Sequence, residues 1–186
     1  MKGASRQWFL GLFVLGGLSC ARAARPTCEN PPPFFVTVEA SDRLNPNAGG
    51  QSLTTQVQVL VLKSAAKLDN AEFSDLWQQA KVWFGEDLLQ EQTVTVDPGS
   101  TTTTGFARDA KAAYLVVMGG FRQPSGTRWR SVFTLPPPAF SHCGPEPMVA
   151  PAVPGKDDAD FHFLMEDFRV GPKAALAPVD LRRGPA

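Results

Sequence analysis

The hydrophobic positions of this chain repeat mostly every second residue, which is the period of a strand with one buried face. Residues 34–40 place Phe34, Val36 and Val38 on one face. Residues 56–63 alternate at first and then become fully apolar, as a strand does when it is buried on both sides. The same kind of pattern predicts four later strands, at residues 92–96, 112–121, 127–136 and 161–170.

One segment changes to the period of a helix. Residues 70–84 carry large apolar side chains three and four positions apart. Asp69, with Glu72 three residues later, resembles a capping box, and Gly85 is suited to end the helix. One helix among short strands predicts a mainly β fold, a two-sheet β-sandwich with a helical insertion between strands 2 and 3.

The first residues have the pattern of an export signal. Lys2 and Arg6 precede an uncharged apolar run over residues 8–18. This run has about the length of a secretory signal core and is too short to cross a bilayer as a stable helix. We therefore expect the protein to be exported.

Two cleavage sites compete at the end of this signal. In "GLSC", Cys20 becomes the first residue of a bacterial lipoprotein, although Gly17 and Leu18 make an imperfect lipobox. In "ARA", residues 21–23 form an ordinary cleavage site, and Cys20 is then lost with the signal peptide. The local motif favours the first site, which makes residues 1–19 the signal peptide and Cys20 the lipidated residue.

The charge balance and the cysteines limit the partners and the covalent links that the protein can have. With Lys2 and Arg6 removed from the 18 basic residues, 16 stand against 18 acidic ones, and no basic cluster is present. A near-neutral chain of this kind argues against a nucleic-acid partner. If Cys20 carries lipid, Cys28 and Cys143 remain as a pair that the exported state allows to form a disulfide. The alternative is two unpaired thiols.

Proline and glycine mark the domain boundaries. Residues 20–33 read as a lipidated N-terminus and an extended, proline-rich tether that is not a packed element, and residues 34–170 as one sandwich domain. Within that domain, residues 41–54 have the composition of a long loop, and residues 136–155 form a proline-rich irregular excursion. Residues 171–186 read as a disordered tail.

Candidates for catalysis are weak. Ser141, His142 and Cys143 are adjacent, and adjacent side chains in an extended segment point in different directions. The chain also contains two pairs of adjacent acidic residues, which solvated surface charge explains better than catalysis does. It contains one pair of adjacent glycines, which close packing between the sheets explains better than phosphate binding does. These pairs are residues 157–158, 166–167 and 119–120. We expect no enzyme, no metal site and no small-molecule substrate.

Six short motifs between residues 34 and 136 occur together in the order and spacing of one protein family. The chain resembles the TssJ family, the outer-membrane lipoprotein of the bacterial type VI secretion system. The motifs are "VTVEASDRLNPNAGGQS", "VQVLVLKSAAKLDNAEFSDLW", "FGEDLL", "VDPGS", "YLVVMGGFRQ" and "TRWRSVFTLP".

This resemblance implies a transthyretin-like sandwich with an added helical part, and an assembly role. Family members are held to the periplasmic face of the outer membrane by an acylated cysteine, here an N-acyl diacylglycerol on Cys20. They bind the periplasmic C-terminal region of the inner-membrane subunit TssM. Ala21 after the cysteine is compatible with delivery to the outer membrane. We suspect that a Cys28–Cys143 disulfide pins the excursion to the tether.

The resemblance also implies a partner-binding loop between the first two strands. We expect Leu44, Asn45 and Pro46 at its working tip, and the alternative is that Leu44 folds back on the body while the loop is merely mobile. The residues assigned to partner binding are Asp42, Arg43, Leu44, Asn45, Pro46 and Asn47.

Two other classes of function remain as alternatives. A soluble periplasmic binding module would lack the lipid and carry a ligand pocket between its sheets. An exported hydrolase would need a nucleophile and base, which the sequence does not offer.

Overall fold

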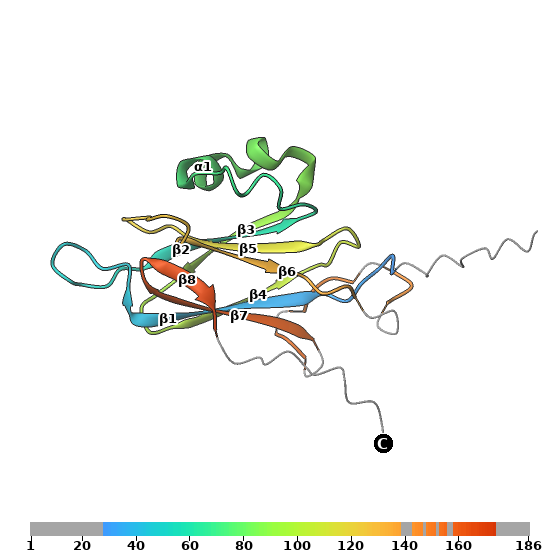
Figure 1. Ribbon diagram of the computed structural model, residues 1–186. Coiled ribbons are helices and arrows are strands. Elements are labelled where there is room, and N and C mark those ends of the chain that lie inside the picture. Colours follow the sequence, from blue (N-terminus) through green and yellow to red (C-terminus); the bar gives the residue numbers. More distant parts are fainter. Residues whose placement is uncertain (1–27, 139–142, 147, 152, 156–157, 174–186) are drawn as a thin grey trace, which may run out of the picture.

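Eight strands form two four-stranded sheets that pack face to face, and a helix covers the outer surface of the second sheet (Figure 1). The computed structural model describes residues 28–138, 143–146, 148–151, 153–155 and 158–173, and these counts refer to them. The strand orders are β4-β1-β7-β8 and β3-β2-β5-β6. The elements are β1 (Phe34–Leu44), β2 (Thr55–Leu62), α1 (Phe73–Phe84), η1 (Gly85–Asp87), β3 (Leu88–Val96), β4 (Thr101–Phe106), β5 (Tyr114–Gly119), β6 (Arg130–Thr134), β7 (Ala159–Asp167) and β8 (Arg169–Pro172). The predicted β-sandwich with a helical insertion between strands 2 and 3 is confirmed.

The first sheet is built around β1, which pairs antiparallel with β4 and parallel with β7. Phe34, Val36 and Val38 are buried in the core, as the alternation predicted. The strand is longer than expected, because residues 41–44 continue it, across a register irregularity, until Leu44 lies opposite Asp167. The prediction that residues 41–54 form one loop is therefore wrong for its first four residues.

The second sheet has both faces covered. Gly119 lies opposite Val57, and a Cβ at Gly119 would lie 2.7 Å from Met165 of β7, so this face of the sheet meets the first sheet. Gly120 faces the helix, since a Cβ there would lie 2.6 Å from the Trp77 ring. The close packing that we expected between the sheets is therefore confirmed for Gly119, whereas Gly120 packs closely on the helix instead. The cover on both faces of the sheet explains why β2 is apolar on both faces.

Helix α1 begins one turn later than the expected capping box. Its N-cap is Glu72, whose backbone N–H donates to Asp75 Oδ2 (3.1 Å), so the Asp69–Glu72 box is wrong. The residues before Glu72 form turns that bury Leu68, and this burial keeps them out of the helix. Gly85 ends the helix at φ 57°, as predicted, and its N–H donates to the Lys81 carbonyl.

The C-terminal part of the sandwich differs from the sequence prediction in three places. Residues 161–170 form two strands instead of one, because Asp167 takes φ 50° and the chain reverses at Phe168. The second strand, β8, runs to Pro172, where it pairs with Phe163, so the prediction that a disordered tail begins at residue 171 is wrong for its first two residues. Strand β6 covers only five residues of the predicted 127–136. Phe133 lies at the edge of the sandwich, where it packs on Phe161 and is 36% exposed.

A disulfide joins Cys28 to Cys143, with 5.6 Å between the two Cα atoms. It connects the tether to the excursion of residues 136–155, which has no helix or strand among its described residues. The described part of the tether packs on the domain, since Pro31 and Pro33 are buried. The expectation of an unpacked tether is therefore wrong for these two prolines.

Candidate partner-binding tip

The two ends of the sandwich are different in kind. Strands β1 and β7 run parallel, so both begin at the end that carries the disulfide and both finish at the opposite end. We call the first end the base and the second the tip. The tip consists of the β1–β2 loop, the β3–β4 turn, the β5–β6 loop and the β7–β8 turn. In Figure 1 the β1–β2 loop projects from the left side of the sandwich.

Two of the predicted partner-binding residues are structural. Leu44 is fully buried and Asn45 is 3% exposed, so the expectation that they stand at an exposed tip is wrong. Leu44 packs in the hydrophobic core at the end of β1, where transferring an apolar side chain out of water stabilises the fold. This is the alternative in which Leu44 folds back on the body.

Asn45 joins three loops through hydrogen bonds. Its backbone N–H donates to the Asp167 carbonyl (2.7 Å), and its Nδ2 donates to Thr55 Oγ1 (3.0 Å). Its Oδ1 accepts from the backbone N–H of Arg122 (2.9 Å). The backbone sits at φ 47°, a left-handed conformation that asparagine tolerates better than most residues. This residue fixes the β1–β2 loop against its two neighbours.

The outer part of the β1–β2 loop is a closed turn. Asn47 Oδ1 accepts from the N–H groups of Gly49 (2.9 Å) and Gln51 (3.0 Å), and the Asn47 N–H donates to the Gln51 carbonyl (2.8 Å). Residues 48–51 are exposed. The surface at the end of the loop is therefore small and polar, and it is held in shape by Asn47.

A hollow lies between this loop and the β7–β8 turn. It has a volume of about 490 Å³ and includes Arg43, Pro46 and Asn47 in its walls, together with Gln123 and Phe168. Arg43 forms an ion pair with Asp167 (3.0 Å), and its side chain is 77% exposed. Of the six predicted residues, Arg43, Pro46 and Asn47 therefore line a concave surface. Asp42 is exposed next to Arg43 in the chain.

Phe168 and the β5–β6 loop also belong to this site, although the sequence did not predict them. Phe168 follows the acidic pair 166–167, which we had interpreted only as solvated charge. Both acidic residues have arginine partners, since Arg169 donates to Glu166 and Arg43 pairs with Asp167. The hydrogen bond to Glu166 raises the pKa of Arg169 above its ordinary value.

The described residues contain no arrangement that indicates catalysis or metal binding. No group of three potential metal ligands occurs among them. Thr37 lies opposite His162 on the neighbouring strand, but its hydroxyl donates to Asp160 (3.0 Å) and not to the histidine, so the two do not form a nucleophile–base pair. Ser141 and His142 lie outside the described residues, as do Cys20, the signal peptide and the tail beyond residue 173. None of the described helices is long and apolar enough to cross a membrane.

Comparison with known proteins identifies the family. The model of the family described as type VI secretion lipoprotein, VasD, EvfM, TssJ matches residues 33–149. The chain belongs to this family. No curated protein matches it significantly. The TssJ family is a structural lipoprotein component of the type VI secretion system.

Solved structures share the TssJ fold. Lip from Serratia marcescens, a membrane-bound component of the type VI secretion system, is 24% identical with a TM-score of 0.65, over 79% of this chain and 99% of that chain. The lipoprotein TssJ1 from Pseudomonas aeruginosa is 21% identical with a TM-score of 0.61, over 80% of this chain and 99% of that chain. A chain in the structure titled "T6SS protein TssM C-terminal domain (869-1107) from EAEC" is 17% identical with a TM-score of 0.55, over 76% and 97%.

Proposed function

We propose that this protein is an outer-membrane lipoprotein of the type VI secretion system that binds the periplasmic C-terminal region of TssM. In this role it attaches the trans-envelope complex to the outer membrane. Membership of the lipoprotein family supports the role, and the position of the tip relative to the tether carries the proposal.

The chain leaves the sandwich at the end farthest from the tip. Strand β1 has 11 residues, which at ~3.3 Å per residue separates base and tip by about 36 Å. Seven residues lie between Cys20 and Cys28, and the eight steps from one Cα to the next span at most about 28 Å when fully extended. A lipid on Cys20 would therefore hold the base near the membrane and direct the tip toward the periplasm.

The anchor is strong enough for this role if Cys20 is triacylated. Each buried methylene contributes ~0.8 kcal/mol, and three acyl chains hold far more firmly than the single myristoyl chain that gives only marginal binding. An attachment of this kind needs no membrane-spanning helix.

The third structural match supports TssM as the partner. The matched chain is shorter than this one, because 76% of this chain corresponds to 97% of the matched chain. The TssM domain that the structure is named after, residues 869–1107, is longer than this whole chain. This is the result expected if a chain of TssJ-like fold was solved together with that domain.

The first test is the mass of the mature protein extracted from membranes. We expect a chain that begins at Cys20 and carries a diacylglycerol and an acyl chain, and a Cys20→Ser variant that is released from the membrane fraction. An unmodified chain beginning at Ala24 would contradict the anchor.

The second test is co-purification with the periplasmic domain of TssM. Wild-type protein should retain the domain, and Ala48→Glu, which places a long charged side chain on the exposed end of the loop, should retain less. Lys111→Glu, an exposed change at the base, is the matched control and should bind as the wild type does. Failure of the wild type to retain TssM would overturn the proposal.

A further inference from the structure

Three adjoining hollows form a trough behind the β1–β2 loop. The central hollow, about 450 Å³, lies between that loop, the β5–β6 loop and the β7–β8 turn. It shares Arg43, Pro46 and Phe168 with the loop hollow described above. It shares Arg128 and Arg169 with a third hollow of about 260 Å³ along β8. We call this continuous surface the tip trough.

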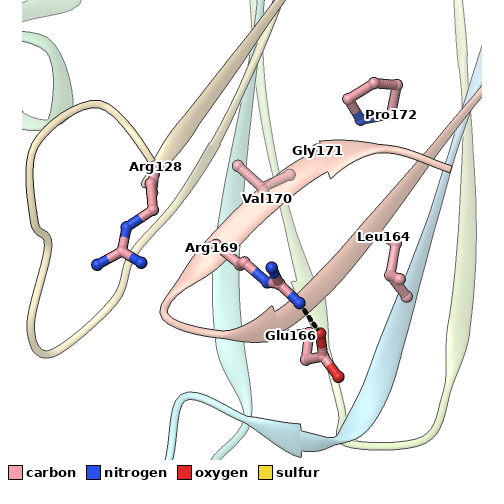
Figure 2. A pocket seen from close by; sticks show the side chains of 7 residues that line it. All are labelled: Arg128, Leu164, Glu166, Arg169, Val170, Gly171 and Pro172. Carbon is pink, nitrogen blue, oxygen red and sulfur yellow. Dashed lines mark hydrogen bonds and ion pairs between the residues drawn. The ribbon is translucent and has the colours of Figure 1, made fainter.

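Three arginines line the tip trough, and they differ in their partners. Arg43 is paired with Asp167 and Arg169 with Glu166. No carboxylate among the described residues forms an ion pair with Arg128. Figure 2 shows Arg128 extending from the β5–β6 loop without a contact to Glu166 or Arg169, which face each other across the hairpin.

The backbone holds Arg128 in place although its side chain is exposed. Its carbonyl accepts a hydrogen bond from the N–H of Val170 in β8 (2.9 Å), which joins the β5–β6 loop to the first sheet. The backbone that carries the guanidinium at the trough is therefore fixed. A fixed backbone reduces the conformational entropy that a partner must remove when it binds.

The trough also has an apolar wall. Phe168 is half-buried against the core at the hairpin turn, and Pro46 stands on the loop side of the same central hollow. Both are rigid side chains, so an apolar group that packs on them loses little freedom.

These observations carry an inference that rests on the proposed function and deepens it. We propose that the tip trough binds an acidic segment of the partner, with a carboxylate at Arg128 and an apolar side chain against Phe168 and Pro46. A guanidinium binds a carboxylate through two parallel hydrogen bonds, so it selects for acidic residues more strongly than a point charge does. A basic segment would be repelled, because both carboxylates of the trough already have arginine partners.

The test measures the affinity of the protein for the periplasmic domain of TssM by calorimetry. Arg128→Glu should weaken binding at least tenfold, and Arg128→Ala by a smaller factor. Arg122→Glu is the matched control, because Arg122 is an exposed arginine of the same loop that lines none of the three hollows. We expect its affinity to stay within threefold of the wild type.

Salt dependence gives a second readout. Raising the salt should weaken wild-type binding more steeply than binding of Arg128→Ala, since one ion pair is missing in the variant. If Arg128→Glu binds as Arg122→Glu does while the wild type binds TssM, the trough proposal is wrong and the proposed function stands. If the wild type does not bind, both are wrong.

Discussion

Replacing Asn45 should loosen the tip more than any exposed change in the same loop. Glycine at this position removes both side-chain hydrogen bonds but keeps the backbone at φ 47° without strain. Each lost bond costs ~1 kcal/mol, and the buried partners left behind add to this, so Asn45→Gly should lower the free energy of unfolding by about 2–3 kcal/mol.

Alanine at the same position separates the contribution of the left-handed backbone to stability from that of the side-chain hydrogen bonds. Asn45→Ala loses the same two hydrogen bonds but, unlike glycine, keeps a Cβ in the left-handed region, which costs ~1–2 kcal/mol relative to glycine. The greater flexibility of glycine in the unfolded chain offsets part of this difference. Alanine should therefore be less stable than glycine by about 1 kcal/mol, an order opposite to that expected in ordinary extended backbone.

Urea unfolding followed by tryptophan fluorescence, with the disulfide intact, measures these differences. In thermal unfolding, at ~3 °C per kcal/mol for a domain of this size, the melting temperature should fall by roughly 7 °C for glycine and 10 °C for alanine. Hydrogen exchange of the Arg122 amide should accelerate in both variants and remain slow in Asn45→Asp, which keeps the acceptor oxygen. Alanine as stable as glycine would refute the backbone argument, and both within 0.5 kcal/mol of the wild type would refute the role of Asn45 as a joint.

Three further changes test other parts of the structure. Cys28→Ser opens a disulfide between residues 115 positions apart, which the chain-entropy model values at about 4–5 kcal/mol, and a melting temperature unchanged by it would contradict that stabilisation. Gly120→Ala brings a Cβ within 2.6 Å of Trp77 and should destabilise by ~1–3 kcal/mol in thermal unfolding. Its control is Gly171→Ala, where nothing lies within 4 Å and stability should hardly change. Arg43→Ala removes an exposed ion pair and should change the free energy of unfolding by less than ~1 kcal/mol in the same urea assay, so a large loss would show that the pair is not a surface feature.

The sequence predicted the elements whose signal is local. Helix α1 and its end at Gly85 were found because helical spacing and a glycine stop lie within one short segment. The β3–β4 turn is local in the same sense, because Pro98 and Gly99 restrict the chain by themselves, and Gly99 has φ 71°. These features depend little on the rest of the chain.

The tip was predicted poorly because it depends on contacts far apart in the sequence. The extension of β1 depends on its pairing with β7, more than 120 residues later in the chain. The reversal at Phe168 depends on the left-handed backbone conformation of Asp167, which several other residues of this segment could have adopted instead. One signal was available and overlooked. Leu44 lies at an even spacing from Phe34, Val36 and Val38, and it is buried with them although the exposed Asp42 interrupts the alternation.

The disulfide at the base determines how a mechanical load would enter the domain. A pull on the chain before Cys28 reaches β1 directly, and through Cys143 it also reaches the segment that leads into β7. These are the two parallel central strands of the first sheet, and both end at the tip. A force between base and tip would therefore act along the strands, so that many hydrogen bonds of β1 and β7 resist together in shear. Opening the disulfide would leave β1 to carry this tension alone.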